Sequence, residues 1–255
     1  MKCYFDGSKV SGPDGHWWLT LAGFTARDDF WNRFEKEWNS EVLHKREPHA
    51  PYLHMTDLLT GNKVFTGWAV ERRQALVMDA LDYLQSCPKL AFEAVVCTID
   101  TTAREKLLEE GYEITDPHVV CGQCALGAAF SWCYEHYPEG IELAHVYFDR
   151  SERFMHPLHE QWQRKKKEER SSTVITDCFW GLIMGVDDCE MDKTPALQAA
   201  DLLAWATSRQ HSKIERPYLY LAEIMKKVIP HSWFTLDENT LRSVHKNDFD
   251  PERAE

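Results

Sequence analysis

The chain is poor in the residues that mark fibrous, low-complexity or membrane-spanning proteins. Of its 255 residues only 12 are glycine and 11 are proline, which excludes a collagen-like or low-complexity chain. The sequence also lacks any stretch that approaches the roughly 20 apolar residues of a membrane-spanning helix. A single large domain is therefore expected over residues 1–236, followed by a polar tail over residues 237–255.

Positive charge is scarce relative to negative charge along the whole sequence. There are 29 lysines and arginines against 41 aspartates and glutamates, which gives a formal net charge of −12. Such a chain cannot hold a nucleic acid through a broad basic surface, because phosphate contacts need Lys and Arg. An anionic membrane surface is excluded as a partner for the same reason. Any nucleic-acid function must depend on a local basic strip or on metal ions bound by some of the carboxylates.

The first residues carry no pattern typical of secretion. Asp6 interrupts the short apolar stretch from Cys3, where a signal peptide would carry its longer apolar run. The eight cysteines are scattered, and without a secretory signal they are expected as reduced thiols. These features predict a cytoplasmic protein.

Strand and helix patterns alternate after an opening hairpin, which predicts one mixed α/β domain. Residues 2–6 form a short apolar strand that ends in the turn residues Asp6 and Gly7, and the β-rich segment 16–24 is its hairpin partner. Further strands are expected at 90–99, 141–149, 173–175 and 179–186, with an extended piece and a loop at 51–59. Helices are expected at 28–47, 66–85, 101–110, 118–137, 152–170, 194–210 and 219–228, and a short one after 237.

Three aspartates stand in or beside apolar segments. Asp6 ends the strand 3–5, Asp149 ends the strand 144–148, and Asp201 lies within the segment 196–206. That segment is apolar nearly all round, so the helix is expected to be buried. A buried carboxylate must be paired, hydrogen-bonded, protonated or bound to a metal. Taken singly, each has an ordinary structural explanation: a turn for Asp6, a helix cap for Asp149 and an ion pair for Asp201.

Taken together, the three acids indicate a metal centre. Two acids at the ends of core strands and one in a core helix can converge on a single point. Clustered carboxylates repel unless a cation lies among them, and hard oxygen ligands select Mg²⁺ or Mn²⁺ rather than zinc. Two such ions roughly 3.5–4 Å apart would activate a water and stabilise the leaving oxygen in phosphodiester hydrolysis.

Four sequence blocks resemble a known family. They are YFDGS at 4–8, HMTDL at 54–58, VYFDRSE at 146–152 and ALQAADLLA at 196–204. In this order they are similar to the motifs of the domain of unknown function 3800 family, and they span most of the chain. The resemblance implies a ribonuclease-H-like α/β fold, with a central mixed five-stranded sheet flanked by helices.

The resemblance also implies an active site and a substrate. Three carboxylates would bind Mg²⁺ or Mn²⁺, and another side chain would complete the metal's ligands or transfer protons. The implied metal ligands are Asp6, Asp149 and Asp201, and the supporting candidates are His54, Asp57 and Glu152. The implied activity is cleavage of a nucleic acid, RNA or DNA, by a two-metal mechanism.

One concentrated basic run is a candidate substrate-binding strip. It comprises Arg164, Lys165, Lys166 and Lys167. Because Glu168 and Glu169 follow directly, a solvated helix face explains the run equally well.

Two features leave other functions open. Gly7 stands where the family often has glutamate after the first aspartate, which together with the charge of −12 leaves open a non-catalytic binding or interaction module with the same fold. Cys121 and Cys124 have the spacing of one half of a zinc site, but no second pair stands at standard spacing. Buried thiols are the simpler interpretation of that pair.

Overall fold

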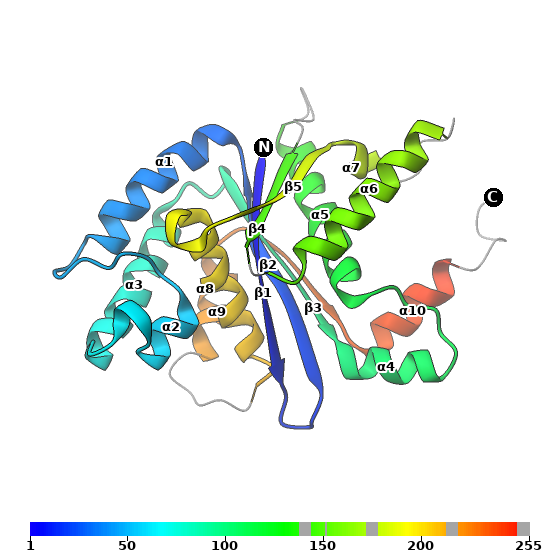
Figure 1. Cartoon of the computed structure of the whole chain (residues 1–255), viewed down its shortest axis with the longest axis horizontal. Helices are drawn as coiled ribbons and strands as arrows, with labels where there is room; N and C mark the ends of the chain where they lie inside the picture. Colours follow the sequence, from blue (N-terminus) through cyan, green and yellow to red (C-terminus); the bar gives the residue numbers. More distant parts are fainter. Residues whose placement is uncertain (138–143, 151, 172–177, 213–218, 249–255) are drawn as a thin grey trace.

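A six-stranded mixed sheet forms the centre of the computed structural model, which describes residues 1–137, 144–150, 152–171, 178–212 and 219–248. The strand order is β5-β4-β1-β2-β3-β6 (Figure 1). The strands are β1 (Lys2–Ser11), β2 (Trp17–Ala26), β3 (Phe92–Asp100), β4 (Ala144–Asp149), β5 (Ile183–Cys189) and β6 (His231–Leu236). β2 is antiparallel to β1 and β3, whereas β4 is parallel to β1, β5 to β4 and β6 to β3.

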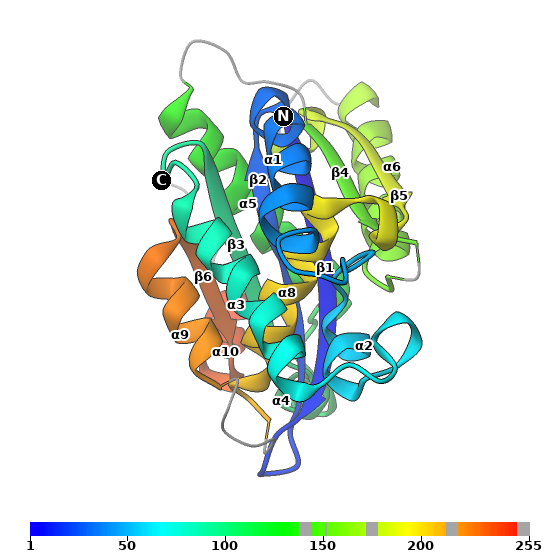
Figure 2. The same cartoon turned by 90° about the vertical axis from the view of Figure 1, so that its left-hand side faces the viewer.

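Helices cover both faces of this sheet, which confirms the predicted α/β class. They are α1 (Asp28–Trp38), α2 (Met55–Thr60), α3 (Val70–Ser86), α4 (Thr101–Glu109), α5 (Pro117–His136), α6 (Met155–Ser171), α7 (Cys178–Gly181), α8 (Pro195–Arg209), α9 (Leu219–Val228) and α10 (Glu238–Asp248). α1, α3, α8 and α9 lie over one face and α4, α5, α6 and α10 over the other (Figures 1 and 2). Among the described helices, none has both the length and the apolarity needed to cross a bilayer.

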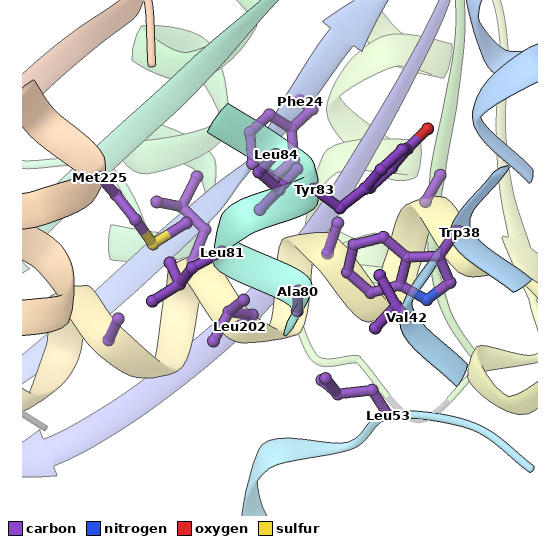
Figure 3. Close-up of a cluster of buried hydrophobic side chains, with 14 of the residues drawn as sticks. Phe24, Trp38, Val42, Leu53, Ala80, Leu81, Tyr83, Leu84, Leu202 and Met225 are labelled. Carbon is purple, nitrogen blue, oxygen red and sulfur yellow. The ribbon is translucent and has the colours of Figure 1, made fainter. Parts of the chain in front are cut away.

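α8 is the central helix of the first layer and is buried on all sides. Every residue from Pro195 to Ser208 is buried, as the apolar sequence predicts. Leu202 belongs to the same buried cluster as Trp38, Leu81 and Met225, which come from three other helices (Figure 3). This packing fixes α8 against β1 and β2 and so determines where its one carboxylate lies.

Gln198 ties three segments to α8 through its side-chain amide. Its Oε1 accepts hydrogen bonds from the Trp38 indole and the Leu53 backbone N–H, both at 3.0 Å. Its Nε2 donates to the Met191 carbonyl at 3.1 Å. A buried amide must have partners for its donors and its acceptor. These hydrogen bonds therefore hold the segments around Leu53 and Met191 against α8, the helix that carries Asp201.

The second layer brings α6 close to α5. Gly122 on α5 makes this possible, because a Cβ at that position would lie 2.1 Å from a methyl carbon of Leu158 on α6. The close approach positions the turn that precedes α6, which carries Glu152.

β1 continues to Ser11 instead of ending at Asp6, so the predicted turn at Asp6 and Gly7 is wrong. Both residues pair with β2, opposite Ala22 and Leu21, and the ladder overrides the local turn preference. The chain reverses at residues 12–16, where the Gly12 N–H donates to the His16 carbonyl at 2.7 Å. Asp6 therefore lies in the middle of a long hairpin.

Several other segments also differ from the sequence-based prediction. Residues 55–60 form α2 where an extended piece and a loop are expected, and residues 178–181 form α7 before β5 begins. The sheet has a sixth strand, β6, which pairs in parallel with β3 at the edge. α1 ends at Trp38, and a π-helical turn follows over residues 39–43. The strand expected at 173–175 lies outside the described residues.

The polar C-terminal segment begins with α10, the short helix expected there. Asp237 caps it by accepting the Thr240 N–H at 2.9 Å. Leu241 is buried in the second-layer core, and Arg242 pairs with Glu110 at 2.7 Å. Residues 237–242 are therefore part of the packed domain.

Candidate active site

Asp6 and Asp149 lie at equivalent positions on neighbouring parallel strands. The last paired residues of β1 and β4 are Phe5 and Phe148, so the two aspartates come next on each strand. Side chains alternate along strands, and the stacked rings of Tyr4 and Tyr147, 5.1 Å apart, mark the same face two residues earlier. That face carries α8, since Tyr4 packs in the core that contains it.

Asp201 reaches the same place from α8. Its Oδ2 accepts the Met55 backbone N–H at 2.5 Å. Its carboxylate lies close enough to Asp6 to raise the pKa of that residue. Two turns along α8, Ser208 accepts a hydrogen bond from Ser8 at 2.8 Å, which fixes the register of the helix against β1. The structure thus gathers the three predicted metal ligands, because both Asp201 and Asp149 lie close enough to Asp6 to raise its pKa.

The crowding of these acids changes their protonation. Burial raises the pKa of Asp6 well above its ordinary value, and the carboxylates of Asp201, Glu152 and Asp149 raise it further. Burial also raises the pKa of Asp201 to about 6, although the nearby His54, the Met55 N–H and the Asp6 carboxyl favour the charged form. Both shifts run in the same direction, so the buried pair favours a protonated form over two adjacent negative charges.

Glu152 contributes a fourth carboxylate next to Gly7. The Gly7 N–H donates to Glu152 Oε2 at 3.0 Å, and the Phe154 N–H donates to Oε1 at 3.2 Å. A Cβ at position 7 would lie 2.6 Å from Oε1. The absence of a side chain at Gly7 is therefore what admits the Glu152 carboxylate to this position against β1.

His54 and Asp57 form a second group with a residue that the sequence did not indicate. His54 Nδ1 lies 2.8 Å from Asp57 Oδ2, and Lys63 Nζ lies 2.9 Å from the same oxygen. Burial would raise the pKa of Asp57, but the Lys63 and His54 contacts outweigh it and hold the pKa below its ordinary value. Lys63 has a left-handed backbone, with φ of 49°, which is uncommon for a residue with a side chain.

A cavity of about 350 Å³ opens over these groups. Its lining includes His54, Asp57, Lys63, Asp149 and, on the opposite wall, Glu190 and Asp192. The segment that carries Glu190 and Asp192 is bonded to Asp149, because Asp149 Oδ1 accepts the Met191 N–H at 3.0 Å. Four carboxylates against two cations, Lys63 and Arg150, make this lining acidic, which suits a metal ion better than a bare phosphate.

The donor set fits Mg²⁺ or Mn²⁺ in its chemistry, because every crowded group is a carboxylate. In the part of the chain that the structure describes, however, no three His, Cys, Asp or Glu side chains stand in an arrangement that could hold a metal ion.

Two other predicted groups lie apart from the carboxylates. The basic run lies on α6 and does not line the acidic cavity. It comprises Arg164, Lys165, Lys166 and Lys167. Cys121 is buried and Cys124 partly buried on α5, and both contact the buried thiol of Cys97. The neighbouring Cys121 thiol raises the pKa of Cys97 most and burial raises it further, which favours an unreactive thiol.

No family model and no curated protein matches the sequence. Among solved structures, a chain of the complex of PCNA with RNase HII from Archaeoglobus fulgidus is similar in fold, with a TM-score of 0.37 and 13% sequence identity. The similarity covers 89% of this chain and 76% of that chain. At this level it says nothing about the chemistry of the site.

Proposed function

We propose that the protein is a divalent-metal-dependent phosphodiesterase of ribonuclease-H-like type that cleaves a nucleic acid. Asp6, Asp149 and Asp201 are the proposed ligands of Mg²⁺ or Mn²⁺. The observation that supports this best is the convergence of buried carboxylates from β1, β4 and α8, close enough to raise the pKa of Asp6. Membership of the domain of unknown function 3800 family is part of the same proposal and rests on the four sequence blocks.

A bound divalent metal would relieve the repulsion among the carboxylates of the site. Several carboxylates share a buried region, and in the metal-free protein one proton reduces their repulsion. Divalent ions would replace that proton and supply the activation of water and the stabilisation of the leaving oxygen that phosphodiester hydrolysis requires. Metal binding is therefore expected to release a proton.

The supporting residues have distinct roles in this proposal. Asp57, itself paired with Lys63, holds His54 at the edge of the acidic cavity, where its imidazole can accept or donate a proton. Glu152 lies on the other side of β1, fixed by the Gly7 N–H, and supplies a further carboxylate beside Asp6.

Cleavage assays test the proposal. Labelled single-stranded RNA, single-stranded DNA, both duplexes and an RNA–DNA hybrid are incubated with the full chain and Mn²⁺ or Mg²⁺. Wild type is expected to cleave at least one of them, EDTA to stop the reaction, and Asp149→Asn to be silent. Asp188→Asn is the matched control, because Asp188 is on the adjacent strand β5 and pairs with the exposed Arg150 instead of the cluster. Equal silence of wild type and Asp149→Asn on every substrate would refute the hydrolase.

A non-catalytic binding module is the second candidate. It is favoured by the lack of a three-ligand arrangement among the described side chains and by glycine at position 7. Calorimetric titration with Mn²⁺ distinguishes the two. Binding that is lost in Asp149→Asn supports the hydrolase, and no heat of binding in a folded wild-type protein supports the module.

A further inference from the structure

A second cavity, of about 410 Å³, lies on the face of β1 opposite the Asp6 carboxylate. We call it the hairpin cavity, and its lining includes Gly7, Lys9, Leu19, Arg104, His118 and Arg153. Because side chains alternate along β1, Gly7 and Lys9 point away from the α8 face to which Asp6 and Ser8 point. Glu152 lines the cavity as well, so the cavity adjoins the carboxylate cluster directly.

The lining carries an excess of positive charge in a protein whose net charge is −12. Its three permanent cations are Lys9, Arg104 and Arg153, and its two carboxylates are Glu105 and Glu152. Glu152 is already bonded to two backbone N–H groups. Within the described residues, none of the three cations forms a salt bridge. Their charges therefore remain available to an anionic ligand.

Arg104 is held in place without losing its charge. Its Nε donates to the Thr115 carbonyl at 3.0 Å, and its Nη2 donates to the Ile114 carbonyl at 2.9 Å. Neutral carbonyl oxygens orient the planar guanidinium but do not neutralise it. A fixed, uncompensated guanidinium is the arrangement that phosphate recognition uses.

An exposed aromatic ring extends this cavity. In the β1–β2 register Lys9 is opposite Leu19 and Ser11 is opposite Trp17, so Lys9, Leu19 and Trp17 share one face of the hairpin. Lys9 Nζ lies 5.1 Å from the Trp17 ring centroid, and Trp17 is 48% exposed. Cations beside an exposed ring are the combination that holds single-stranded nucleic acid, because every base has a face that can stack.

We propose that the hairpin cavity and Trp17 bind a single-stranded segment of nucleic acid next to the carboxylate cluster, with phosphates at Lys9 and Arg104 and a base on Trp17. This inference rests on the proposed function and names the strandedness of its substrate. Lys9 is three residues beyond Asp6 along β1, a separation of about 10 Å. The cavity thus supplies a local basic surface beside the acidic site.

Binding without metal tests this site separately from cleavage. The full chain is titrated into a 5′-fluorescein-labelled single-stranded 12-nucleotide DNA in EDTA, by fluorescence anisotropy, at several salt concentrations. Each of Lys9→Gln and Arg104→Gln is expected to lower the log–log salt slope by about 0.7, the value of one single-strand phosphate contact. Trp17→Ala is expected to weaken binding about tenfold with no change in slope, since stacking involves no charge. Lys89→Gln, on an exposed segment between α3 and β3, is the matched control.

The outcomes separate this inference from the proposed function. Slopes for Lys9→Gln and Arg104→Gln that equal the Lys89→Gln slope would overturn the binding site, even if wild type cleaves with Mn²⁺. No binding by wild type in EDTA, or tighter binding of the matching duplex, would overturn it as well. Cavity-dependent binding by a protein that cleaves nothing would support the site and remove the hydrolase.

Discussion

Replacing Asp201 with asparagine is expected to stabilise the metal-free protein, although the residue is buried in the core. The rise of the Asp201 pKa from 3.8 to about 6 means that folding penalises its charged form. At about 1.4 kcal/mol per pKa unit, that rise corresponds to about 3 kcal/mol at neutral pH. Asparagine still accepts the Met55 N–H, and the weaker neutral hydrogen bond costs about 1 kcal/mol. The net gain in unfolding free energy is then about 2 kcal/mol.

The pH dependence of this gain follows from the sign of the pKa shift. A carboxyl whose pKa is raised by folding destabilises the native state only where it is ionised, so its penalty grows as the pH rises from about 4 to above 6. Wild type and Asp201→Asn are therefore expected to be about equally stable at pH 4.5 and to differ by about 2 kcal/mol at pH 7.5. Urea unfolding in EDTA, followed by tryptophan fluorescence, measures both values.

Asp57→Asn provides a control of opposite sign. Its pKa is lowered by Lys63 and His54, so loss of its charge is expected to destabilise the protein at pH 7.5. The reasoning is refuted if Asp201→Asn is less stable than wild type at pH 7.5, or if its offset from wild type is the same at both pH values.

Three further predictions concern the same framework. Gly7→Ala is expected to displace the flexible Glu152 carboxylate. Cleavage should then fall at least about tenfold, while the unfolding free energy changes by less than about 1 kcal/mol. Unchanged kcat/KM would contradict this role of Glu152. Millimolar Mn²⁺ is expected to raise the Tm of wild type but not that of Asp149→Asn, and EDTA is expected to reverse the rise. An equal rise in wild type and in Asp149→Asn would show that Asp149 is not a ligand. Asp79→Asn weakens the two hydrogen bonds from Arg46, at 2.6 and 2.9 Å, and is expected to lower the unfolding free energy by about 2 kcal/mol at pH 7. The loss should be smaller below pH 4, because the pKa of Asp79 is lowered in the folded protein. A loss in urea unfolding that does not change with pH would contradict this prediction.

The sequence predicted the parts of the site that depend on apolar periodicity. An aspartate inside an apolar helix had to be buried, and Asp201 is 5% exposed in α8. Two aspartates at the ends of apolar segments suggested convergence, and the parallel register of β1 and β4 brings Asp6 and Asp149 side by side. These predictions work because side-chain burial follows the pattern of residues along a single element.

The remaining parts of the site depend on contacts that no local pattern encodes. Lys63 joins Asp57 through a left-handed backbone position, and Glu152 fits against β1 only because residue 7 has no side chain. The turn predicted at Asp6 failed because pairing with β2 outweighs a local Asp-Gly preference. β6 has the mixed sequence HSWFTL, with no clear alternation, and forms because β3 offers it an edge.

A crystal structure of the protein soaked in Mn²⁺ at about pH 7.5, with anomalous data at the manganese edge, tests the central claim most directly. The account predicts manganese bound by the carboxylate oxygens of Asp6, Asp149 and Asp201. Crystals that show no manganese among these three carboxylates would contradict it.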